Sequence, residues 1–314
     1  MQERGFGGGP DKGAERRGAF QPPGMLDSRA ALARGVGVLW RGFDVQNISR
    51  WWTGQIQDES IPGDKHTVFT DLDSTNLNNP ALLERIAVRT FERPEWRHFD
   101  EDYLTFVTVH PNRKKKNGQW VPQPRGVSRT ELTHAPVGGA LEGSEYFYRW
   151  STWFEERDSE GKIAFPIGDG IGGVWQVFTQ WHQASNTGSP PFQFSVKRRR
   201  DGSPYIGLEF GVQPAVWTTP FHYNVWHNFI VYVKYSNRGH GQVGLWYSIY
   251  SELPQQVGPF WSVNTTAATG RNSKPYLKQG LYRSANYYGL RYSRVVHSGI
   301  TEGSTLESVW PRVT

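Results

Sequence analysis

From about residue 36 onward, apolar and polar side chains alternate along short segments that are separated by Gly, Pro, Asn and Asp. A period of two is typical of β-strands with one buried face, and β-branched and aromatic residues favour the same structure. The pattern occurs in Tyr103–Val109, Ser128–His134, Tyr146–Phe154, Val174–His182, Phe192–Lys197, Tyr205–Phe210, Trp226–Tyr235, Gln242–Ile249, Lys274–Tyr282 and Tyr287–His297. It predicts an all-β protein, built as a two-sheet antiparallel β-sandwich or β-jelly roll.

The N-terminal region has a different composition. Residues 1–24 are rich in Gly, Pro and charged residues, which predicts a disordered arm because too little apolar surface can be buried to offset the ordering entropy. Helical periodicity is weak, and only Met25–Arg34 and Pro80–Phe91 are predicted to form short helices. We interpret residues 25–314 as a single large sandwich domain.

The composition indicates a large core and excludes several kinds of chemistry. The 14 Trp, 14 Tyr and 17 Phe among 314 residues can fill a sizeable interior. The chain contains no cysteine, which excludes a disulfide scaffold, thiolate zinc sites and a cysteine nucleophile. No apolar stretch approaches the roughly 18 residues of a membrane helix. The first 24 residues lack the apolar core of a signal peptide, so we expect neither a membrane segment nor an encoded export signal.

The charge balance favours an anionic partner. Lys and Arg total 35 against 29 Asp and Glu, which gives a net charge of +6. Two basic runs, residues 113–116 and 197–200, adjoin the turn sequences at 117–118 and 201–202 and could gather a polyanion, although solvated hairpin ends have the same appearance. No zinc-finger, helix-turn-helix or RNA-recognition pattern is present, so we do not expect nucleic acid as the partner.

Three predicted strands combine polar residues on one face. On Val174–His182, alternation places Gln176, Gln180 and His182 on one face with Phe178, and Trp175, Val177, Thr179 and Trp181 on the other, which we interpret as core. A half-exposed strand with an ordinary polar face would show the same pattern. On Ser128–His134, Arg129 and Glu131 share a face, where the planar guanidinium fork suits a carboxylate. Tyr276, Lys278 and Tyr282 share a face of Lys274–Tyr282, and Gly280 between them permits a close approach to the backbone.

The three sets together resemble jelly-roll polysaccharide lyases. Residues 129–132 read Arg-Thr-Glu-Leu, residues 180–182 read Gln-Trp-His, and residues 276–282 read Tyr-Leu-Lys-Gln-Gly-Leu-Tyr. Roughly from residue 36 to 300, the chain is similar to the heparin lyase I-like group, the family-7 alginate lyases and the glucuronan lyases. The resemblance implies a concanavalin-like jelly roll. Two positions differ from the alginate lyases. This chain has Trp181 where those enzymes usually have an aliphatic residue, and Arg283 where they commonly have an Asn.

The resemblance also implies a site and a reaction. A lyase of this kind removes the C5 proton of a uronate, after Arg129 and Gln180 have neutralised the adjacent carboxylate. His182 and Tyr282 are the available base and acid, and the assignment between them stays open. A second set of residues is expected to bind the substrate: Glu131, Tyr276, Lys278, Gln176, Lys197 and Arg283.

We therefore expect an endo-acting lyase that cleaves a uronate-containing anionic polysaccharide, of glucuronan, alginate or heparin type, and leaves unsaturated ends. A carbohydrate-binding module on the same sandwich is the main alternative, because fold does not imply activity. A glycoside hydrolase ranks below it, since the chain lacks the Glu-x-Asp-x-x-Glu strand of sandwich hydrolases.

Further expectations concern cofactors, assembly and location. The nine His are dispersed, so we expect no catalytic metal and no required cofactor, although a structural Ca²⁺ held by loop oxygens is compatible with such sandwiches. The protein is expected to be a monomer. Because polymeric substrates lie outside cells, we expect extracellular action, as a secreted or virion-borne enzyme.

Overall fold

The computed structural model of the chain describes the residues from which the fold is built, and these comprise residues 38–41, 53–57, 68–71, 86–90, 103–109, 113–122, 127–136, 139–167, 175–183, 189–266, 275–284 and 292–311. The predicted arm at 1–24 and the predicted helix at Met25–Arg34 lie outside these residues.

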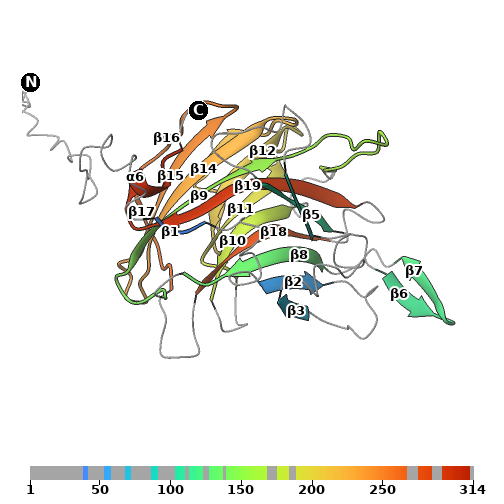
Figure 1. Cartoon of the computed structure of the whole chain (residues 1–314), viewed down its shortest axis with the longest axis horizontal. Helices are drawn as coiled ribbons and strands as arrows, with labels where there is room; N and C mark the ends of the chain where they lie inside the picture. The colour runs from blue at the N-terminus through green and yellow to red at the C-terminus, as the bar shows by residue number, and fades with distance from the viewer. Residues whose placement is uncertain are drawn as a thin grey trace, which may run out of the picture.

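The described residues form two large antiparallel sheets (Figure 1). The nine-stranded sheet consists of β1 (Val38–Arg41), β4 (Ile86–Thr90), β5 (Tyr103–Val109), β9 (Glu145–Trp153), β14 (Trp226–Lys234), β15 (Gln242–Ile249), β16 (Gln255–Gln256), β17 (Trp261–Ser262) and β19 (Ser293–Gly303). The eight-stranded sheet consists of β2 (Thr53–Gln57), β3 (Val68–Asp71), β8 (Val127–His134), β10 (Gln176–His182), β11 (Phe192–Arg198), β12 (Pro204–Phe210), β13 (Trp217–Pro220) and β18 (Tyr276–Ser284). The predicted all-β two-sheet sandwich of the jelly-roll kind is confirmed.

The order of the eight-stranded sheet brings distant segments together. Its strands follow the order β13-β12-β11-β10-β18-β8-β2-β3, so β18 lies between β10 and β8. The three strands that carry the predicted polar faces are therefore direct neighbours, although more than 140 residues separate β8 from β18 in the sequence.

The core between the sheets is built largely from aromatic rings. Trp150 of β9 stacks on Phe229 of β14 with ring centres 5.1 Å apart, and Trp181 of β10 stacks on Phe192 of β11 at 4.4 Å. Trp150 and Trp181 meet across the sandwich at 5.9 Å. All four side chains are fully buried, and each contributes roughly 1.5–3 kcal/mol of hydrophobic stabilisation.

The interior also contains polar links between the two sheets. His134 at the end of β8 lies 3.2 Å from the carboxylate of Glu302 on β19, and both side chains are almost fully buried. Because an unpaired charge would be costly there, each residue requires the other. Such links fix how the sheets sit on one another.

Two small elements lie outside the main strands. The hairpin of β6 (Arg113–Lys116) and β7 (Gln119–Pro122) contains the first basic run, and in Figure 1 it protrudes from the sandwich. It turns at Asn117 and Gly118, with φ values of 52° and 79°, which matches the predicted turn. The short helix α6 (Leu306–Val309) is capped by Thr305. No described helix is long and apolar enough to cross a membrane.

One predicted helix is wrong. Part of the predicted helix Pro80–Phe91 is strand β4, whose Ile86 pairs with Val107 of β5 and is fully buried. Pairing with a long neighbouring strand outweighs weak helical periodicity, especially where β-branched residues recur. The predicted strands were otherwise found with shifted ends, the largest shift being that of the last strand, which runs from Ser293 to Gly303.

Candidate active site

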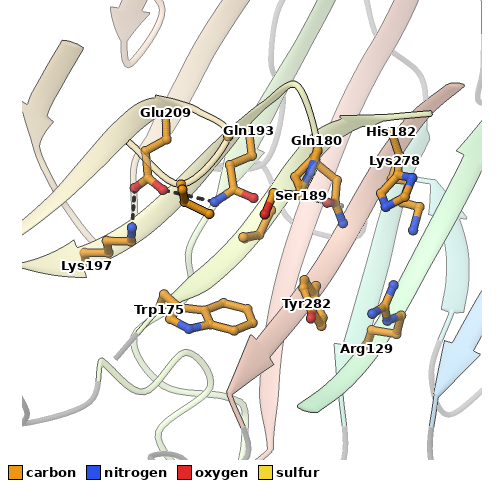
Figure 2. A pocket seen from close by; sticks show the side chains of 14 residues that line it. Arg129, Trp175, Gln180, His182, Ser189, Gln193, Lys197, Glu209, Lys278 and Tyr282 are labelled. Carbon is orange, nitrogen blue, oxygen red and sulfur yellow. Dashed lines mark hydrogen bonds and ion pairs between the residues drawn. The ribbon is translucent and has the colours of Figure 1, made fainter. Parts of the chain in front are cut away.

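One face of the eight-stranded sheet carries a pocket with a volume of ≈ 720 Å³. Its walls come from the neighbouring strands β8, β18, β10, β11 and β12 and from residues next to these strands, Trp175, Ser189, Pro190, Gly211 and Val212 (Figure 2). The lining residues are Arg129, Trp175, Val177, Gln180, His182, Ser189, Pro190, Gln193, Lys197, Glu209, Gly211, Val212, Lys278 and Tyr282.

The strand register arranges polar residues of this pocket in a row across the strands. Lys278 on β18 lies opposite Gln180 on β10. Gln180 lies opposite Gln193 on β11, which in turn lies opposite Glu209 on β12. Three strand spacings of ~4.8 Å make the row about 14 Å long. A linear chain that crosses the strands therefore meets these four side chains in turn.

A charged group, which we call the Glu131 cluster, occupies one end of the row and comprises Arg129, Glu131, Gln180 and Lys278. The carboxylate of Glu131 lies 3.5 Å from Arg129 Nη1 and 3.5 Å from Lys278 Nζ. It also accepts a hydrogen bond from Gln180 Nε2. Because two cations share one carboxylate, the cluster keeps a surplus positive charge for an anionic ligand.

Gly280 allows β8 to bring Glu131 this close to β18. Its φ is 149°, and a Cβ atom there would lie 2.3 Å from the carbonyl oxygen of Thr130 and 2.8 Å from the Cα atom of Glu131. Only glycine fits both the conformation and the space. The close approach that the sequence indicates at Gly280 is thus made by β8.

Tyr282 is held between two other pocket side chains, as Figure 2 shows. The guanidinium of Arg129 lies over the Tyr282 ring, 4.0 Å from its centre, and the Trp175 ring meets it edge to face at 4.8 Å. Burial raises the pKa of Tyr282 above its ordinary value, and the positive charge of Arg129 opposes that rise. The phenol is therefore protonated at neutral pH and can donate its proton.

His182 has the opposite protonation behaviour. Its Nδ1 lies 2.6 Å from the carbonyl oxygen of Gln183, and because a carbonyl only accepts, Nδ1 carries the proton. Nε2 of the neutral ring is then an acceptor. Burial lowers the pKa of His182, and the positive charges of Lys278 and Arg129 act in the same direction. His182 is therefore a neutral ring that can accept a proton at pH 7.

Lys278 and Tyr276 complete this end of the site. Lys278 is 1% exposed, and burial lowers the pKa of its ammonium while Glu131 opposes the change. Tyr276 lies beside the pocket, with its ring 5.7 Å from the His182 ring and 5.6 Å from Lys278 Nζ. Burial raises the pKa of Tyr276 to about 12.

The structure corrects the predicted faces of β10. Gln176 was expected in the pocket, but its side chain is fully buried and its Nε2 donates to the carbonyl oxygen of Pro166. Trp175 and Val177, which the alternation assigned to the core, line the pocket instead. The cause is a β-bulge between Val177 and Thr179, where β10 has one residue more than β11. Because of this extra residue, the side chains before the bulge point to the opposite face of the sheet from the one that simple alternation predicts.

Arg283 is a second correction. The residue was expected to bind substrate, yet it is 1% exposed and faces the interior of the sandwich. Its Nε donates to Ser128 Oγ, and its Nη1 donates to Ser293 Oγ on the other sheet. Strand alternation explains this placement, because the preceding Tyr282 faces the pocket.

Six predicted residues line the pocket: Arg129, Gln180, His182, Lys197, Lys278 and Tyr282. Glu131 and Tyr276 lie beside the pocket and contact residues of its lining. Lys197 lines the pocket at the far end from Arg129, where it forms an ion pair with Glu209. Trp175, Gln193 and Glu209 also line the pocket, although the sequence pattern did not predict them there. For Gln193 and Glu209 the sequence signal is their place between apolar neighbours on alternating strands, which indicates an outward face but does not distinguish a pocket.

Three aromatic residues in or near Gly-, Pro- and Thr-rich segments pack against the protein. Trp217 meets the Tyr247 ring at 5.0 Å, Trp261 packs near Phe210, and the Tyr223 hydroxyl donates to a backbone carbonyl. The aromatic rings of Trp175 and Tyr282 line the pocket.

The described residues contain no group of three or more His, Asp or Glu side chains that could hold a metal ion.

With this geometry in place, the comparison with known proteins identifies the class. The family model of polysaccharide lyases matches residues 43–307, which is most of the chain. The protein belongs to this polysaccharide lyase family. No curated protein matches its sequence.

Several solved structures are similar to the chain. An endo-β-1,4-glucuronan lyase from the fungus Trichoderma reesei has a TM-score of 0.47 and 16% identity over 72% of this chain and 94% of that one. A catalytic domain of glycoside hydrolase family 131 from Coprinopsis cinerea has a TM-score of 0.44 and 18% identity, and the match covers 67% of this chain and 73% of that one. An alginate lyase from Chlorella virus has a TM-score of 0.42 and 8% identity, and the match covers 85% of this chain and 100% of that one.

Proposed function

We propose that the protein is an endo-acting lyase that cleaves a uronate-containing anionic polysaccharide by β-elimination. One observation carries the proposal. A guanidinium, an amide, an imidazole and a phenol line one pocket, and they belong to Arg129, Gln180, His182 and Tyr282. Together with the neighbouring Lys278, this set supplies the positive charge, the base and the acid that such an elimination needs. We also propose a place near the heparin lyase I-like group, which the motifs at 129–132, 180–182 and 276–282 support.

The first step is neutralisation of the substrate carboxylate. The C5 proton of a uronate becomes acidic only when the negative charge that develops can spread onto the adjacent carboxylate. The Glu131 cluster offers its surplus positive charge, through Arg129 and Lys278, at the place where that carboxylate would bind. Charges fixed in a partly buried site act more strongly than they would in water.

The second step is proton transfer. In the proposed assignment His182 Nε2 removes the C5 proton, because the ring is neutral and Nδ1 is tied to the Gln183 carbonyl. The C5–H electrons form the C4=C5 double bond as the C4–O bond breaks. Tyr282, which is protonated at neutral pH, donates its proton to the departing glycosidic oxygen. Arg129 over its ring stabilises the phenolate that results.

The competing functions use the same groove differently. A binding module would need the cations and aromatic surface but not His182 and Tyr282 together. A hydrolase would need two carboxylates about 5–10 Å apart on either side of the bond. Glu131 and Glu209 are both engaged by cations and amides, which suits neither proton donation nor nucleophilic attack.

The proposal is tested by incubating the purified protein with separate polyuronates and following ultraviolet absorbance of the conjugated product. The panel contains glucuronan, alginate blocks of each epimer, heparin, heparan sulfate and hyaluronan, each with and without calcium. Rising absorbance with at least one of them is expected. A flat trace with retained binding would instead favour the binding module.

A further inference from the structure

A second polar group, the Glu209 cluster, lies at the other end of the pocket and comprises Gln193, Ser195, Lys197 and Glu209. Glu209 Oε1 lies 2.6 Å from Lys197 Nζ and accepts a hydrogen bond from Ser195 Oγ at 2.7 Å. Glu209 Oε2 accepts from Gln193 Nε2 at 3.0 Å. Figure 2 shows Lys197 and Gln193 converging on this carboxylate.

The exposed fractions of these side chains show which of them hold the cluster together and which of them a ligand could contact. The Glu209 side chain is 3% exposed and accepts from three partners, so it acts as an anchor. The Lys197 side chain keeps 30% of its surface exposed, and Gln193 is also partly exposed. An ammonium has three N–H donors, of which this ion pair uses one. Lys197 and Gln193 are therefore the groups that a ligand would meet.

The hydrogen bond with Glu209 also fixes which end of the Gln193 amide faces the pocket. A carboxylate only accepts hydrogen bonds, so the amide nitrogen of Gln193 must face Glu209. Its carbonyl oxygen consequently lies at the other end of the planar amide. The cluster thus offers an N–H donor on Lys197 next to an oxygen acceptor on Gln193.

This pairing matches a hydroxyl group and disfavours an anion. A hydroxyl both donates and accepts, whereas a carboxylate or a sulfate only accepts. Lys197 and Glu209 carry one charge each, so the cluster is formally neutral, unlike the Glu131 cluster. An anion placed here would be attracted by the Lys197 ammonium but repelled by the Glu209 carboxylate and the Gln193 carbonyl oxygen.

The position of the cluster relates it to the reaction. Gln193 is directly opposite Gln180, one strand spacing of ~4.8 Å away, and Glu209 is one spacing further. We propose that Lys197 and Gln193, anchored by Glu209, form a subsite for the hydroxyl groups of an unsulfated sugar next to the reacting uronate. This inference rests on the proposed function for the position of that uronate.

The first test removes the two contacting groups singly. Lys197→Met and Gln193→Met are each expected to raise KM for glucuronan about tenfold, as a lost hydrogen bond predicts, with kcat within twofold of wild type. Lys162→Met is the matched control, because Lys162 pairs with Glu160 in an exposed loop where both side chains are about two-thirds exposed. Unchanged KM in both pocket variants would show that the ion pair is only structural and would overturn the subsite.

The second test reverses the selectivity. Glu209→Gln keeps the shape of the anchor but leaves Lys197 uncompensated. The ratio of heparin affinity to glucuronan affinity is expected to rise severalfold in calorimetric titrations. An unaltered ratio would contradict the neutral character assigned to the subsite.

Direct binding measurements keep this inference separate from the proposed function. If wild-type protein shows no turnover but Lys197→Met and Gln193→Met weaken glucuronan binding, the lyase assignment fails and the subsite stands. If the wild type cleaves glucuronan and neither variant changes KM or affinity, the subsite fails alone. A thermal melt of each variant checks that the sandwich is intact.

Discussion

The two ends of the pocket are built on the same plan and differ in charge. At each end the carboxylate of an almost fully buried glutamate anchors polar side chains of neighbouring strands. Glu131 holds two cations and the amide of Gln180, whereas Glu209 holds one cation, the amide of Gln193 and a hydroxyl. The first cluster therefore has an excess positive charge, and the second is neutral.

The neighbours of the two clusters differ as well. Tyr282 and His182 lie beside the Glu131 cluster, one protonated and the other a neutral acceptor at pH 7. β12, the strand that carries Glu209, is instead followed by Gly211 and Val212 in the pocket wall. A buried carboxylate among strands can thus serve chemistry or recognition, and the surplus charge and adjacent proton carriers decide which.

The largest expected effect comes from removing the phenolic proton. Tyr282→Phe should lower kcat on the cleaved polyuronate by about 10²–10⁴, because general acid catalysis contributes this much. The ring, its contact with Arg129 and its contact with Trp175 are retained, so KM should change little. Initial rates of absorbance increase measure both constants.

Tyr276→Phe is the matched control, since Tyr276 is also a buried phenol on β18 but lies beside the pocket rather than in its lining. Its effect should be less than tenfold. If Tyr276→Phe were the more damaging change, the acid would be Tyr276 and the geometry assigned to Tyr282 would be wrong.

The same substitution at both anchors sharpens the comparison directly. Glu131→Gln should lower kcat about 100-fold, because Arg129 and Lys278 lose the group that positions them. Loss of one partner from a buried ion pair also costs about 3–5 kcal/mol of stability, which a thermal melt would show. Glu209→Gln should leave kcat within twofold of wild type.

If Glu131 had a purely structural role, Glu131→Gln would lower the melting temperature but would not change the pH profile of kcat/KM. Glu131 raises the pKa of His182, so its removal should shift the acid limb of kcat/KM to lower pH. Equal losses of kcat in the two variants would show that the ends of the pocket are not functionally different.

The sequence was informative where strand alternation is regular. Arg129 and Glu131 on β8, and Tyr276, Lys278 and Tyr282 on β18, share faces as alternation predicts, because both strands pair without a shift in register. Alternation failed on β10 because the bulge after Val177 depends on how three strands pair, which no local pattern specifies. Arg283 was misplaced although alternation itself turns it inward.

The Glu209 cluster shows what single-sequence reasoning could not supply. Gln193 and Glu209 are separated by the β11–β12 turn, and nothing in their types distinguishes them from ordinary polar positions on exposed faces. Only the register reveals that they continue the row of Lys278 and Gln180. The basic run at 197–200 indicated an anionic contact, but the ion pair with Glu209 neutralises Lys197.

The smallest effect concerns pH and tests the roles given to His182 and Tyr282. Since burial lowers the pKa of His182 below 6.5 and only its neutral form accepts a proton, kcat/KM should not begin to fall on the acid side until the pH is below about 6.5. Below the lowered pKa it should fall by at most tenfold per unit. The raised pKa of Tyr282 keeps its phenol protonated beyond pH 10, so an alkaline limb at lower pH would report Lys278, whose pKa burial lowers.

Acid unfolding must be separated from this titration. Burial lowers the pKa of His227 to about 4 and that of His297 to about 3, so both take up protons on unfolding below their ordinary pKa of 6.5. The stability that they contribute is therefore complete above pH 6.5 and is lost as the pH falls toward 3. Melting temperatures recorded at each pH would show whether the protein is still folded where kcat/KM declines. An acid limb at or above pH 7 in folded protein would contradict His182 as the base, because its surroundings lower its pKa rather than raise it.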